Sequence, residues 1–197
     1  MIRVGIIGGI GSGKSFIAKL FGCPVFNADN EVKYIYKSDK LCFNKLKKKL
    51  PNFIKNFPIK KKELALAISA NKKNLKLISS IVHPLVRKRM KKFIIKHKKQ
   101  KMIVLDIPLL IENKLNKKKD TLIFIQSKNS NVLARLKKRP NFNEKLIRRL
   151  NENQVMLSRK RKLAKYVINN NFSIKIMKKR VKLVKNKILN EGNSSRY

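Results

Sequence analysis

Short apolar runs alternate along the chain with longer segments in which apolar residues recur at helical spacing. The short runs are rich in β-branched residues and too brief for helices, which predicts buried strands. They lie at 3–7, 25–26, 102–105, 121–125 and 166–168. Helical spacing is found at 16–21, 131–138 and 174–189. This alternation predicts an α/β fold in which helices cover both faces of a parallel sheet of about five strands.

Two segments interrupt the alternation. Residues 38–101 contain amphipathic helical pieces and no strand-like run, which predicts a helical, substrate-binding insertion at the carboxyl edge of the sheet. Residues 139–163 are helical and very basic, which fits either a lid over a site or a solvated helix pair. The predicted organisation is one domain over 1–197, with a core at about 1–37, 102–138 and 164–190, the insertion at about 38–101 and a lid at about 139–163. The last residues, from Glu191, are expected to fray.

A glycine-rich loop lies between the first predicted strand and the first predicted helix. Its residues, Gly8-Gly9-Ile10-Gly11-Ser12-Gly13-Lys14-Ser15, fit the pattern G-x-x-x-x-G-K-[ST]. Glycines let successive backbone N–H groups point at phosphate oxygens, and the helix start adds its positive dipole end. We expect Lys14 to reach the phosphate oxygens and the Ser15 hydroxyl to ligate magnesium. The sequence therefore predicts a three-layer fold like that of the P-loop nucleoside triphosphate hydrolases.

Two acidic residues follow predicted strands. Asp29 lies just past the run at 25–26, where a carboxylate can accept a proton from an acceptor hydroxyl. Aspartate in a strand-to-helix turn is also a common helix cap, so its position alone leaves both interpretations open. Asp106 ends the run at 102–105, where P-loop proteins keep an acidic residue for the magnesium shell. Ser15 and Asp106 are the predicted metal ligands.

The charge of the chain suggests a second hypothesis. With 51 lysine and arginine residues against 10 aspartate and glutamate residues, the formal net charge is +41, which favours binding to polyanions. The basic residues are mostly lysines scattered over the helical segments, and aromatic residues are not interleaved with them as a base-stacking surface needs. A genome drifting toward A and T would write Lys, Asn and Ile at tolerant surface positions, and we favour this explanation over a nucleic-acid footprint. We expect no specific nucleic-acid partner.

Other features of the composition bound the setting of the protein. No run of about 18 apolar residues is present, and the first residues lead directly into a predicted strand, so we expect a cytoplasmic protein without a membrane partner. Cys23 and Cys42 have neither metal-site nor disulfide spacing, which favours buried or incidental thiols. A monomer or weak homo-oligomer is expected.

Four segments, in the same order along the chain, resemble the dephospho-coenzyme A kinase family. The loop at 8–15 resembles the family's GGIGSGKS loop, and Ala28-Asp29 matches the second half of its Asp-Ala-Asp motif. His83-Pro84 matches a His-Pro pair, and Asp106 to Glu112 resembles the segment D-x-PLL-x-E. A weaker fifth match runs from Gln154 through 164–168 to Asn170, which is similar to the family's Gln and its ADYVI-x-N stretch.

The resemblance implies a kinase that uses ATP and Mg²⁺ to phosphorylate the ribose 3′-hydroxyl of dephospho-CoA. It implies that Asp29 orients or deprotonates that hydroxyl, and that Arg139 stabilises charge on the transferring phosphoryl group. The implied nucleotide-binding residues are Gly9, Gly11, Ser12, Gly13, Lys14, Ser15, Phe16 and Asn170. The implied acceptor-binding residues are Asp29, His83, Pro108, Leu109 and Glu112.

Several of these assignments have plain structural alternatives. His83 fits a histidine hydrogen-bonded at a helix start before Pro84 as well as it fits a substrate contact. Arg135 fits a cation on a helix surface. Asn27 stands where the family usually has the first Asp, so hydrogen bonding survives there but charge does not. Phe16 replaces the usual hydroxyl residue; if that hydroxyl serves the α-phosphate in the family, a backbone N–H must suffice here.

Further departures are Gly8 in place of a usual Thr and Lys165 in place of an Asp, and the second is interpreted as surface drift. The departures spare Gly13, Lys14, Ser15 and the two strand-end aspartates, so the sequence predicts an active enzyme. A kinase for another small hydroxyl compound is the alternative within the P-loop class. A basic nucleic-acid-binding ATPase is the alternative from another class, and it predicts ATP hydrolysis that RNA or DNA stimulates.

Overall fold

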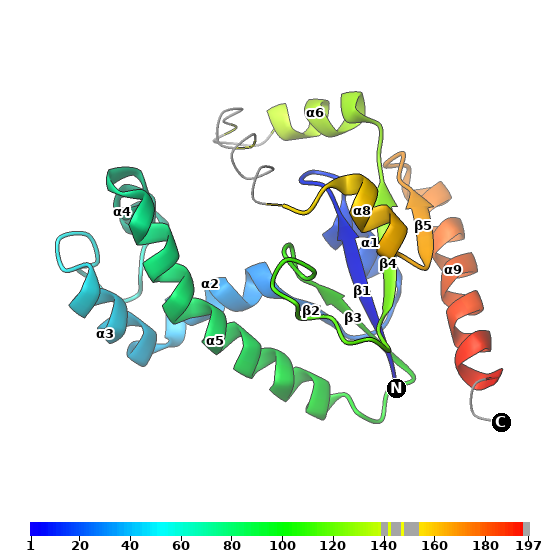
Figure 1. Ribbon diagram of the computed structural model, residues 1–197, viewed down its shortest axis with the longest axis horizontal. Coiled ribbons are helices and arrows are strands. Elements are labelled where there is room, and N and C mark those ends of the chain that lie inside the picture. Colours follow the sequence, from blue (N-terminus) through cyan, green and yellow to red (C-terminus); the bar gives the residue numbers. More distant parts are fainter. Residues whose placement is uncertain (139–141, 143–146, 148–153, 195–197) are drawn as a thin grey trace. The chain divides into compact units, whose positions relative to one another are not determined.

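A computed structural model describes residues 1–138, 142, 147 and 154–194 (Figure 1). Contacts within the chain divide it into two compact units. The sheet unit comprises Met1–Asn27 and His97–Tyr197, and the helical unit comprises Ala28–Lys96. The predicted boundaries of core, insertion and lid stay predictions, and most of 139–153 lies outside the described residues.

The sheet unit is built on five parallel strands in the order β2-β3-β1-β4-β5. They are β1 (Ile2–Gly8), β2 (Val25–Asn27), β3 (Met102–Asp106), β4 (Thr121–Gln126) and β5 (Tyr166–Asn169). Every residue of β3 is buried, as an inner strand covered on both faces requires. The five short apolar runs thus form the strands that their pattern predicts. Because all strands are parallel, their carboxyl ends share one edge of the sheet.

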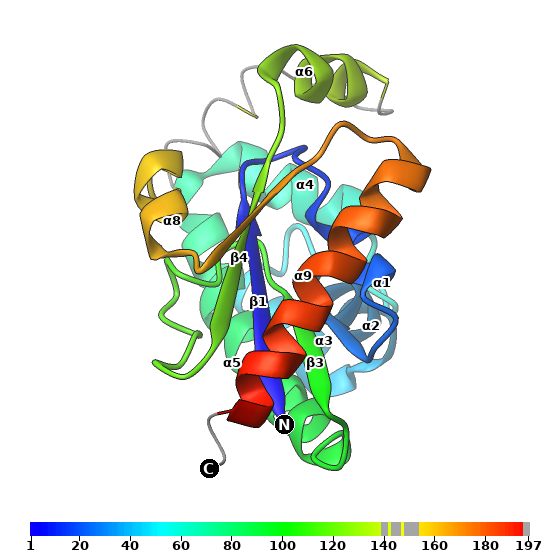
Figure 2. The same ribbon diagram turned by 90° about the vertical axis from the view of Figure 1, so that its right-hand side faces the viewer.

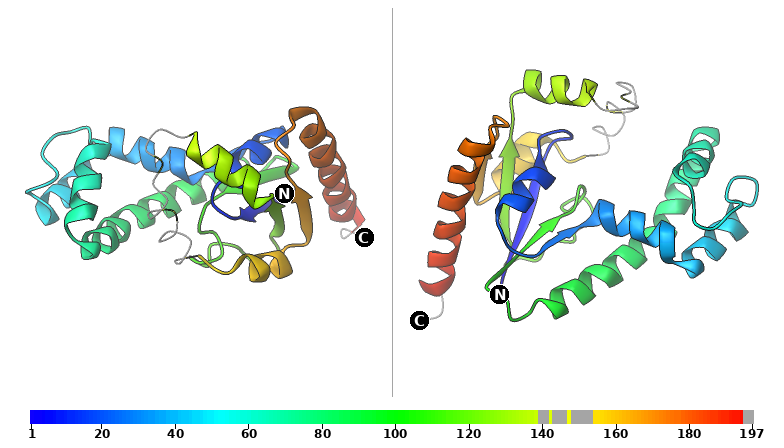
Figure 3. Two further views of the ribbon diagram at one scale, coloured as in Figure 1. Left: turned by 90° about the horizontal axis from the view of Figure 1, so that it is seen from above. Right: turned by 180° about the vertical axis from the view of Figure 1, so that it is seen from behind.

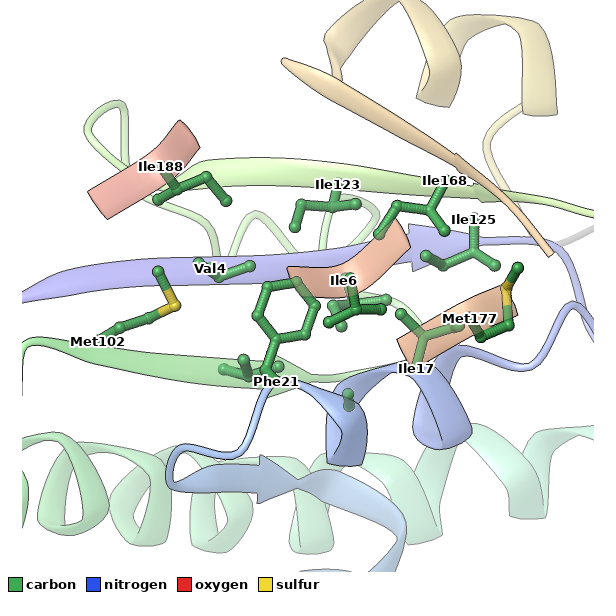
Figure 4. Close-up of a cluster of buried hydrophobic side chains, with 13 residues drawn as sticks. Val4, Ile6, Ile17, Phe21, Met102, Ile123, Ile125, Ile168, Met177 and Ile188 are labelled. Carbon is green, nitrogen blue, oxygen red and sulfur yellow. The ribbon is translucent and has the colours of Figure 1, made fainter. Parts of the chain in front are cut away.

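Two helices cover one face of the sheet, α1 (Lys14–Leu20) and α9 (Ile174–Ser194). Ile17 and Phe21, from α1 and its C-terminal cap, meet strand residues such as Val4 and Ile123, and Met177 joins them from α9 (Figure 4). These side chains are all at most 1% exposed. Burial of this kind stabilises a domain by about 1.5–3 kcal/mol for each large aliphatic or aromatic side chain.

The other face of the sheet is covered by α8 (Leu157–Leu163) and by the loop after β3. Leu110 from that loop lies so close to β1 that a Cβ on Gly5 would be 2.6 Å from its Cδ2. Helix α6 (Asn129–Lys137) follows β4 and lies beyond the carboxyl ends of the strands (Figure 2). Helices on both faces confirm the predicted three-layer α/β architecture.

The end of α9 differs from the expectation of fraying. The helix continues to Ser194, and Glu191 accepts a hydrogen bond from the Tyr166 hydroxyl at 2.6 Å. Glu191 also pairs with Lys165 at 2.6 Å. The end of α9 is therefore held against the start of β5. The local sequence could not indicate this contact, because the partners lie about 25 residues apart.

The helical unit consists of α2 (Ala28–Ser38), α3 (Lys40–Lys49), α4 (Lys61–Ala70) and α5 (Lys72–Lys96). Helix α5 contacts each of the other three (Figure 3). Val82, Val86 and Met90 recur every four residues on α5 and are buried, so one stripe of the helix supplies the core of the unit. Residues 28–96 contain no strand, as predicted for most of this region.

Both cysteines are free, Cys23 half-buried and Cys42 buried. Burial raises the pKa of the Cys42 thiol to about 11, so this side chain behaves as a small apolar residue. Within the part of the chain that the structure describes, no helix is long and apolar enough to cross a membrane.

Candidate active site

The glycine-rich loop leads from the carboxyl end of β1 into α1. Gly11 and Gly13 have φ angles of 77° and 89°, in the left-handed region that favours glycine. A Cβ on Gly13 would lie 2.4 Å from Asn170 Nδ2. Both the backbone conformation and the neighbouring side chain therefore exclude any other residue at this position.

The loop is held from outside by residues that follow β4 and β5. The Ser12 carbonyl oxygen accepts hydrogen bonds from Asn170 Nδ2 at 2.8 Å and from Ser127 Oγ at 3.0 Å. Asn170 is 3% exposed, and its backbone N–H donates to the Gln126 carbonyl at 2.7 Å. Its Oδ1 accepts from the Phe172 N–H at 2.9 Å. Asn170 thus supports the loop through its amide nitrogen, while its amide oxygen holds the segment after β5, and the sequence did not indicate this bracing role.

The cation of the loop folds back over the loop itself. Lys14 Nζ donates to the carbonyl oxygens of Gly8 at 3.1 Å and Gly9 at 2.8 Å. Helix α1 begins at Lys14, and the N–H groups at its start have no acceptor within the helix. Ser15 is exposed, whereas Phe16 packs against the core of the sheet unit. The side chain of Phe16 is therefore turned to packing, and only its N–H remains for an anion.

A buried carboxylate lies next to the strand that carries the loop. Asp106, 2% exposed, ends β3, where it pairs in register with Ile6 of β1 and Asn27 of β2. Asn27 Nδ2 donates a hydrogen bond to Asp106 Oδ2. The expectation that hydrogen bonding survives the change from Asp to Asn at position 27 is confirmed.

The edge of the sheet beside the loop contains two oxygen-bearing side chains of the type that magnesium prefers, Ser15 and Asp106. Among the described residues, no three His, Cys, Asp or Glu side chains gather as a metal site. Magnesium in phosphate-transferring sites is held by one or two protein oxygens together with substrate phosphates and water. The Ser15 hydroxyl and the Asp106 carboxylate meet that requirement in chemical type.

The segment after β3 contains three of the predicted acceptor-binding residues. Pro108 and Leu109 are partly exposed. Glu112 Oε1 pairs with Lys160 Nζ at 2.7 Å and accepts from the Val155 N–H at 3.0 Å. Burial alone raises the pKa of Glu112, but the hydrogen bonds from Lys160 and from backbone N–H groups outweigh it, and its pKa lies below the usual range.

Lys160 is a site residue that sequence reasoning missed. It stands on α8 between Arg159 and Arg161 in a very basic run, so nothing local marks it as the buried member. Its side chain is 1% exposed. Only the fold shows that this lysine faces inward.

Two cavities open at the carboxyl edge of the sheet unit. One, of about 350 Å³, is lined by Gly9 and Ser12 of the loop and by Leu157 and Arg161 of α8. The other, of about 490 Å³, is lined by residues at and after the ends of β4 and β5, including Ser127, Asn169, Asn170, Asn171 and Arg180. The glycine-rich loop thus has space for a ligand beside it.

Arg135 precedes the predicted lid, and Arg139 is its first residue. Arg135 is exposed on α6, and its guanidinium stacks over the Phe172 ring at 4.3 Å from the ring centroid. It is more than an isolated surface cation, because the stack joins α6 to the segment after β5. Arg139 lies outside the described residues.

The helical unit carries Asp29 and His83. Asp29 is exposed and is the second residue of α2, which begins at Ala28, so Asp29 lies inside the first turn and is not the helix cap that the sequence left open. A carboxylate in the first turn also interacts favourably with the helix dipole.

The position of His83 corrects the helix-start interpretation. His83 and Pro84 lie in the middle of α5, eleven residues or more from its first residue. Proline there removes one backbone hydrogen bond of the helix. His83 is half-buried, and burial together with the nearby Arg87 charge lowers its pKa, so the imidazole is neutral near pH 7.

Comparison with known proteins decides the family. The sequence profile of the dephospho-CoA kinases matches residues 2–175. The chain belongs to the dephospho-CoA kinase family. The dephospho-CoA kinase of Wolbachia pipientis wMel is 33% identical over 175 residues, 86% of this chain and 89% of that protein. The dephospho-CoA kinase of Rhizobium meliloti (strain 1021) is 30% identical over 189 residues, 93% of this chain and 96% of that protein.

Solved structures agree with the P-loop kinase fold. The protein TT1252 from Thermus thermophilus has a TM-score of 0.75 at 25% identity and covers 93% of this chain and 95% of its own. Dephospho-CoA kinase from Campylobacter jejuni has a TM-score of 0.66 at 22% identity, with 94% of this chain and 96% of its own covered. The family that the four sequence segments indicated is therefore confirmed, and so is the fold predicted for a dephospho-CoA kinase.

Proposed function

We propose that this protein transfers the γ-phosphoryl group of ATP to the ribose 3′-hydroxyl of dephospho-CoA, giving CoA and ADP in the last step of coenzyme A biosynthesis. The observation that carries the proposal is the glycine-rich loop, braced by Ser127 and Asn170 in a chain of the dephospho-CoA kinase family. Phosphoryl transfer depends mainly on positioning and charge stabilisation, which such a preformed loop supplies.

In this proposal the nucleotide phosphates lie on the backbone of the loop. The N–H groups from Gly9 to Phe16 point at the β- and γ-phosphates, and Lys14 exchanges its carbonyl partners for phosphate oxygens. The contact residues are Gly9, Gly11, Ser12, Gly13, Lys14, Ser15 and Phe16. Asn170 acts beside them by fixing the Ser12 carbonyl, which keeps the neighbouring N–H groups directed inward.

Ser15 and Asp106 are the proposed magnesium ligands. A magnesium ion held by these two residues would offset the charge that develops on the phosphoryl group during transfer. Asp106 contributes its charge from the end of β3, and Asn27 holds one of its two oxygens in place. The neutral amide at position 27 gives Asp106 a donor where a carboxylate would repel it.

Asp29 is the proposed base that orients or deprotonates the 3′-hydroxyl. Its exposure on the first turn of α2 leaves the carboxylate accessible to a ligand. His83, Pro108 and Leu109 are proposed to shape the acceptor pocket, and Glu112 supports that pocket through its pairing with Lys160. Arg139 is proposed to stabilise charge on the phosphoryl group. We expect the protein to work in the cytoplasm, without a specific nucleic-acid partner, as a monomer or weak homo-oligomer.

The test is a coupled assay that follows ADP release with ATP, magnesium and dephospho-CoA. The expected product is CoA, with the new phosphate on the 3′-oxygen as read by ³¹P NMR or fragmentation mass spectrometry. Adenosine and shikimate serve as hydroxyl compounds that the enzyme should leave unmodified. Folded protein that binds ATP and releases no 3′-phosphorylated product would refute the proposal.

A further inference from the structure

Lys160 stands apart from the other basic residues of α8. Arg159, Arg161 and Lys162 are exposed, whereas the Lys160 side chain is 1% exposed. The other buried polar residues of the described chain are Ser12, Asp106 and Asn170, which already belong to the loop and its strand edge. Lys160 is thus a buried charge whose role in the proposed reaction so far is only to pair with Glu112.

Lys160 and Glu112 form a buried pair with two further polar partners, while Glu112 Oε2 has no hydrogen-bond partner among the described residues. Lys160 Nζ lies 2.7 Å from Glu112 Oε1 and donates to Gln154 Oε1 at 2.9 Å. The Val155 N–H donates to the same Glu112 oxygen at 3.0 Å. The Lys160–Glu112 pair joins the segment after β3 to α8, across 48 residues of sequence.

Stabilisation of the fold does not by itself explain a buried ion pair such as Lys160–Glu112. Removing two charges from water costs several kcal/mol per ion, and apolar residues of similar volume often replace a buried pair without loss of stability. What this pair provides, with its two further partners Gln154 and Val155, is a fixed geometry, because a rotation of α8 would separate the two charges. Lys160 therefore sets which side of α8 faces the sheet.

The residue that follows Lys160 on α8 is Arg161. It lines the cavity of about 350 Å³ together with Gly9 and Ser12 of the glycine-rich loop. On the same helix, Leu157 Cδ2 lies 3.5 Å from the position of a Cβ on Gly9, which fixes α8 against the loop. Ser12 is 4% exposed and its Oγ has no hydrogen-bond partner among the described residues, so the cavity offers an unsatisfied polar group beside a cation.

We propose that Arg161 is a further phosphate-binding residue of the kinase reaction and that Lys160 and Glu112 are the positioning pair that holds it. This inference rests on the proposed function. Arg161 offers a planar set of donors that matches two phosphate oxygens, whereas Lys14 offers a point charge. The two cations approach the phosphates from different elements, so charge that develops on the transferring group is met from two directions.

The first experiment compares Arg161→Gln with the matched control Arg159→Gln. Both remove one exposed arginine from α8, so both change the net charge equally, but Arg159 does not line the cavity. We expect Arg161→Gln to lower kcat/KM for ATP by about 10²-fold and Arg159→Gln to stay within about twofold of wild type. Equal values for the two variants would overturn the proposal.

Calorimetric titration with ATP in the absence of acceptor separates this inference from the proposed function. Weaker ATP binding in Arg161→Gln than in Arg159→Gln supports a phosphate contact even if wild type fails to phosphorylate dephospho-CoA. Active wild type with equal ATP affinity and equal turnover in both variants sinks the phosphate contact and leaves the proposed function standing.

The second experiment tests the positioning pair with the double variant Lys160→Met, Glu112→Leu. Because the replacement is apolar and of similar volume, we expect a melting temperature close to that of wild type but kcat/KM lowered toward the value of Arg161→Gln. Adding Arg161→Gln to the double variant should then cost much less than it costs in wild type, as expected of residues that act as a unit. Normal turnover of the folded double variant, or fully additive losses, would overturn the positioning role.

Discussion

The sheet unit and the helical unit bury different kinds of side chain. In the described residues, the buried polar side chains Ser12, Asp106, Lys160 and Asn170 all belong to the sheet unit. In the helical unit, the buried side chains of the described residues are apolar, and its ion pair between Arg89 and Glu31 is partly exposed. One unit holds polar groups in fixed positions, and the other is held together by apolar packing.

This difference matters because the two kinds of burial respond differently to substitution. A buried polar group needs its partner at hydrogen-bond distance, and a lost partner leaves an uncompensated group. Apolar packing tolerates exchange between residues of similar size. Changes to buried side chains should therefore reduce function first in the sheet unit and stability first in the helical unit.

The largest expected loss of activity follows removal of the cation of the glycine-rich loop. Lys14→Ala should reduce kcat by about 10³-fold and weaken ATP binding, because the lysine is the cation that the loop itself brings to the phosphates. Steady-state kinetics and ATP titration measure both effects. The control Lys19→Ala, on the exposed side of the same helix, should behave like wild type. A similar loss of kcat in both variants would assign the effect to the overall positive charge of the protein and not to the position of Lys14 in the loop.

The next effect probes the single proposed base, which lies in the helical unit. Asp29→Asn should lower kcat by about 10²-fold and leave ATP affinity unchanged, since loss of a general base removes proton transfer but no phosphate contact. Single-turnover kinetics with saturating ATP measures the chemical step. Glu31→Gln, two residues further along α2, is the matched control. Unchanged turnover in Asp29→Asn would reduce Asp29 to a residue that favours the helix start.

A smaller effect contrasts the two units directly. Asn170→Ala should cost about 1–3 kcal/mol of unfolding free energy and also weaken ATP binding, because the Ser12 carbonyl and the loop lose their support. Ile35→Val, at a position 1% exposed in α2, should cost about 0.5–1.5 kcal/mol and leave ATP binding unchanged. Urea denaturation and ATP titration check both variants. Equal ATP affinity in the two would contradict the contrast.

The smallest expected effect is a change in how stability depends on pH. The folded-state pKa of His83 is lowered, so the unfolded chain binds the proton more tightly and stability falls as pH drops below about 6.5. Urea midpoints measured from pH 7.5 to 5.5 should decline less in His83→Gln than in wild type. Parallel declines in the two proteins would assign the pH dependence to other groups. Glu112, whose pKa is also lowered, loses its contribution only in more acidic solution.

Much of the fold could be predicted because local patterns specify it. The run Met102–Asp106 is apolar and short, and every residue of the resulting strand is buried. The glycine-rich loop is recognisable because its glycines and Lys14 are consecutive in sequence. The acidic residue at the end of β3 follows from the same local pattern, since a strand end is visible where the apolar run stops.

Other features depend on partners far apart in the chain. Asn170 supports the Ser12 carbonyl across 158 residues, and its local sequence indicates only a polar turn. The same limit applies to Glu191, which was expected in a frayed end but bonds to Tyr166. A helix start was one of two interpretations of His83, because proline is favoured at the first position of a helix, yet the apolar stripe of α5 continues through it.

The sequence by itself determined the alternation of strands and helices, the phosphate-binding loop and the family, because each is written in neighbouring residues whose spacing has a direct geometric meaning. The tertiary structure alone decided which of several adjacent cations is buried, which carbonyl of the loop is braced and which oxygen of Glu112 is paired. The reason is that burial and hydrogen bonding depend on the side chains that other elements bring to a position. In a chain with 51 basic residues, only that environment distinguishes Lys160 from the lysines on the surface.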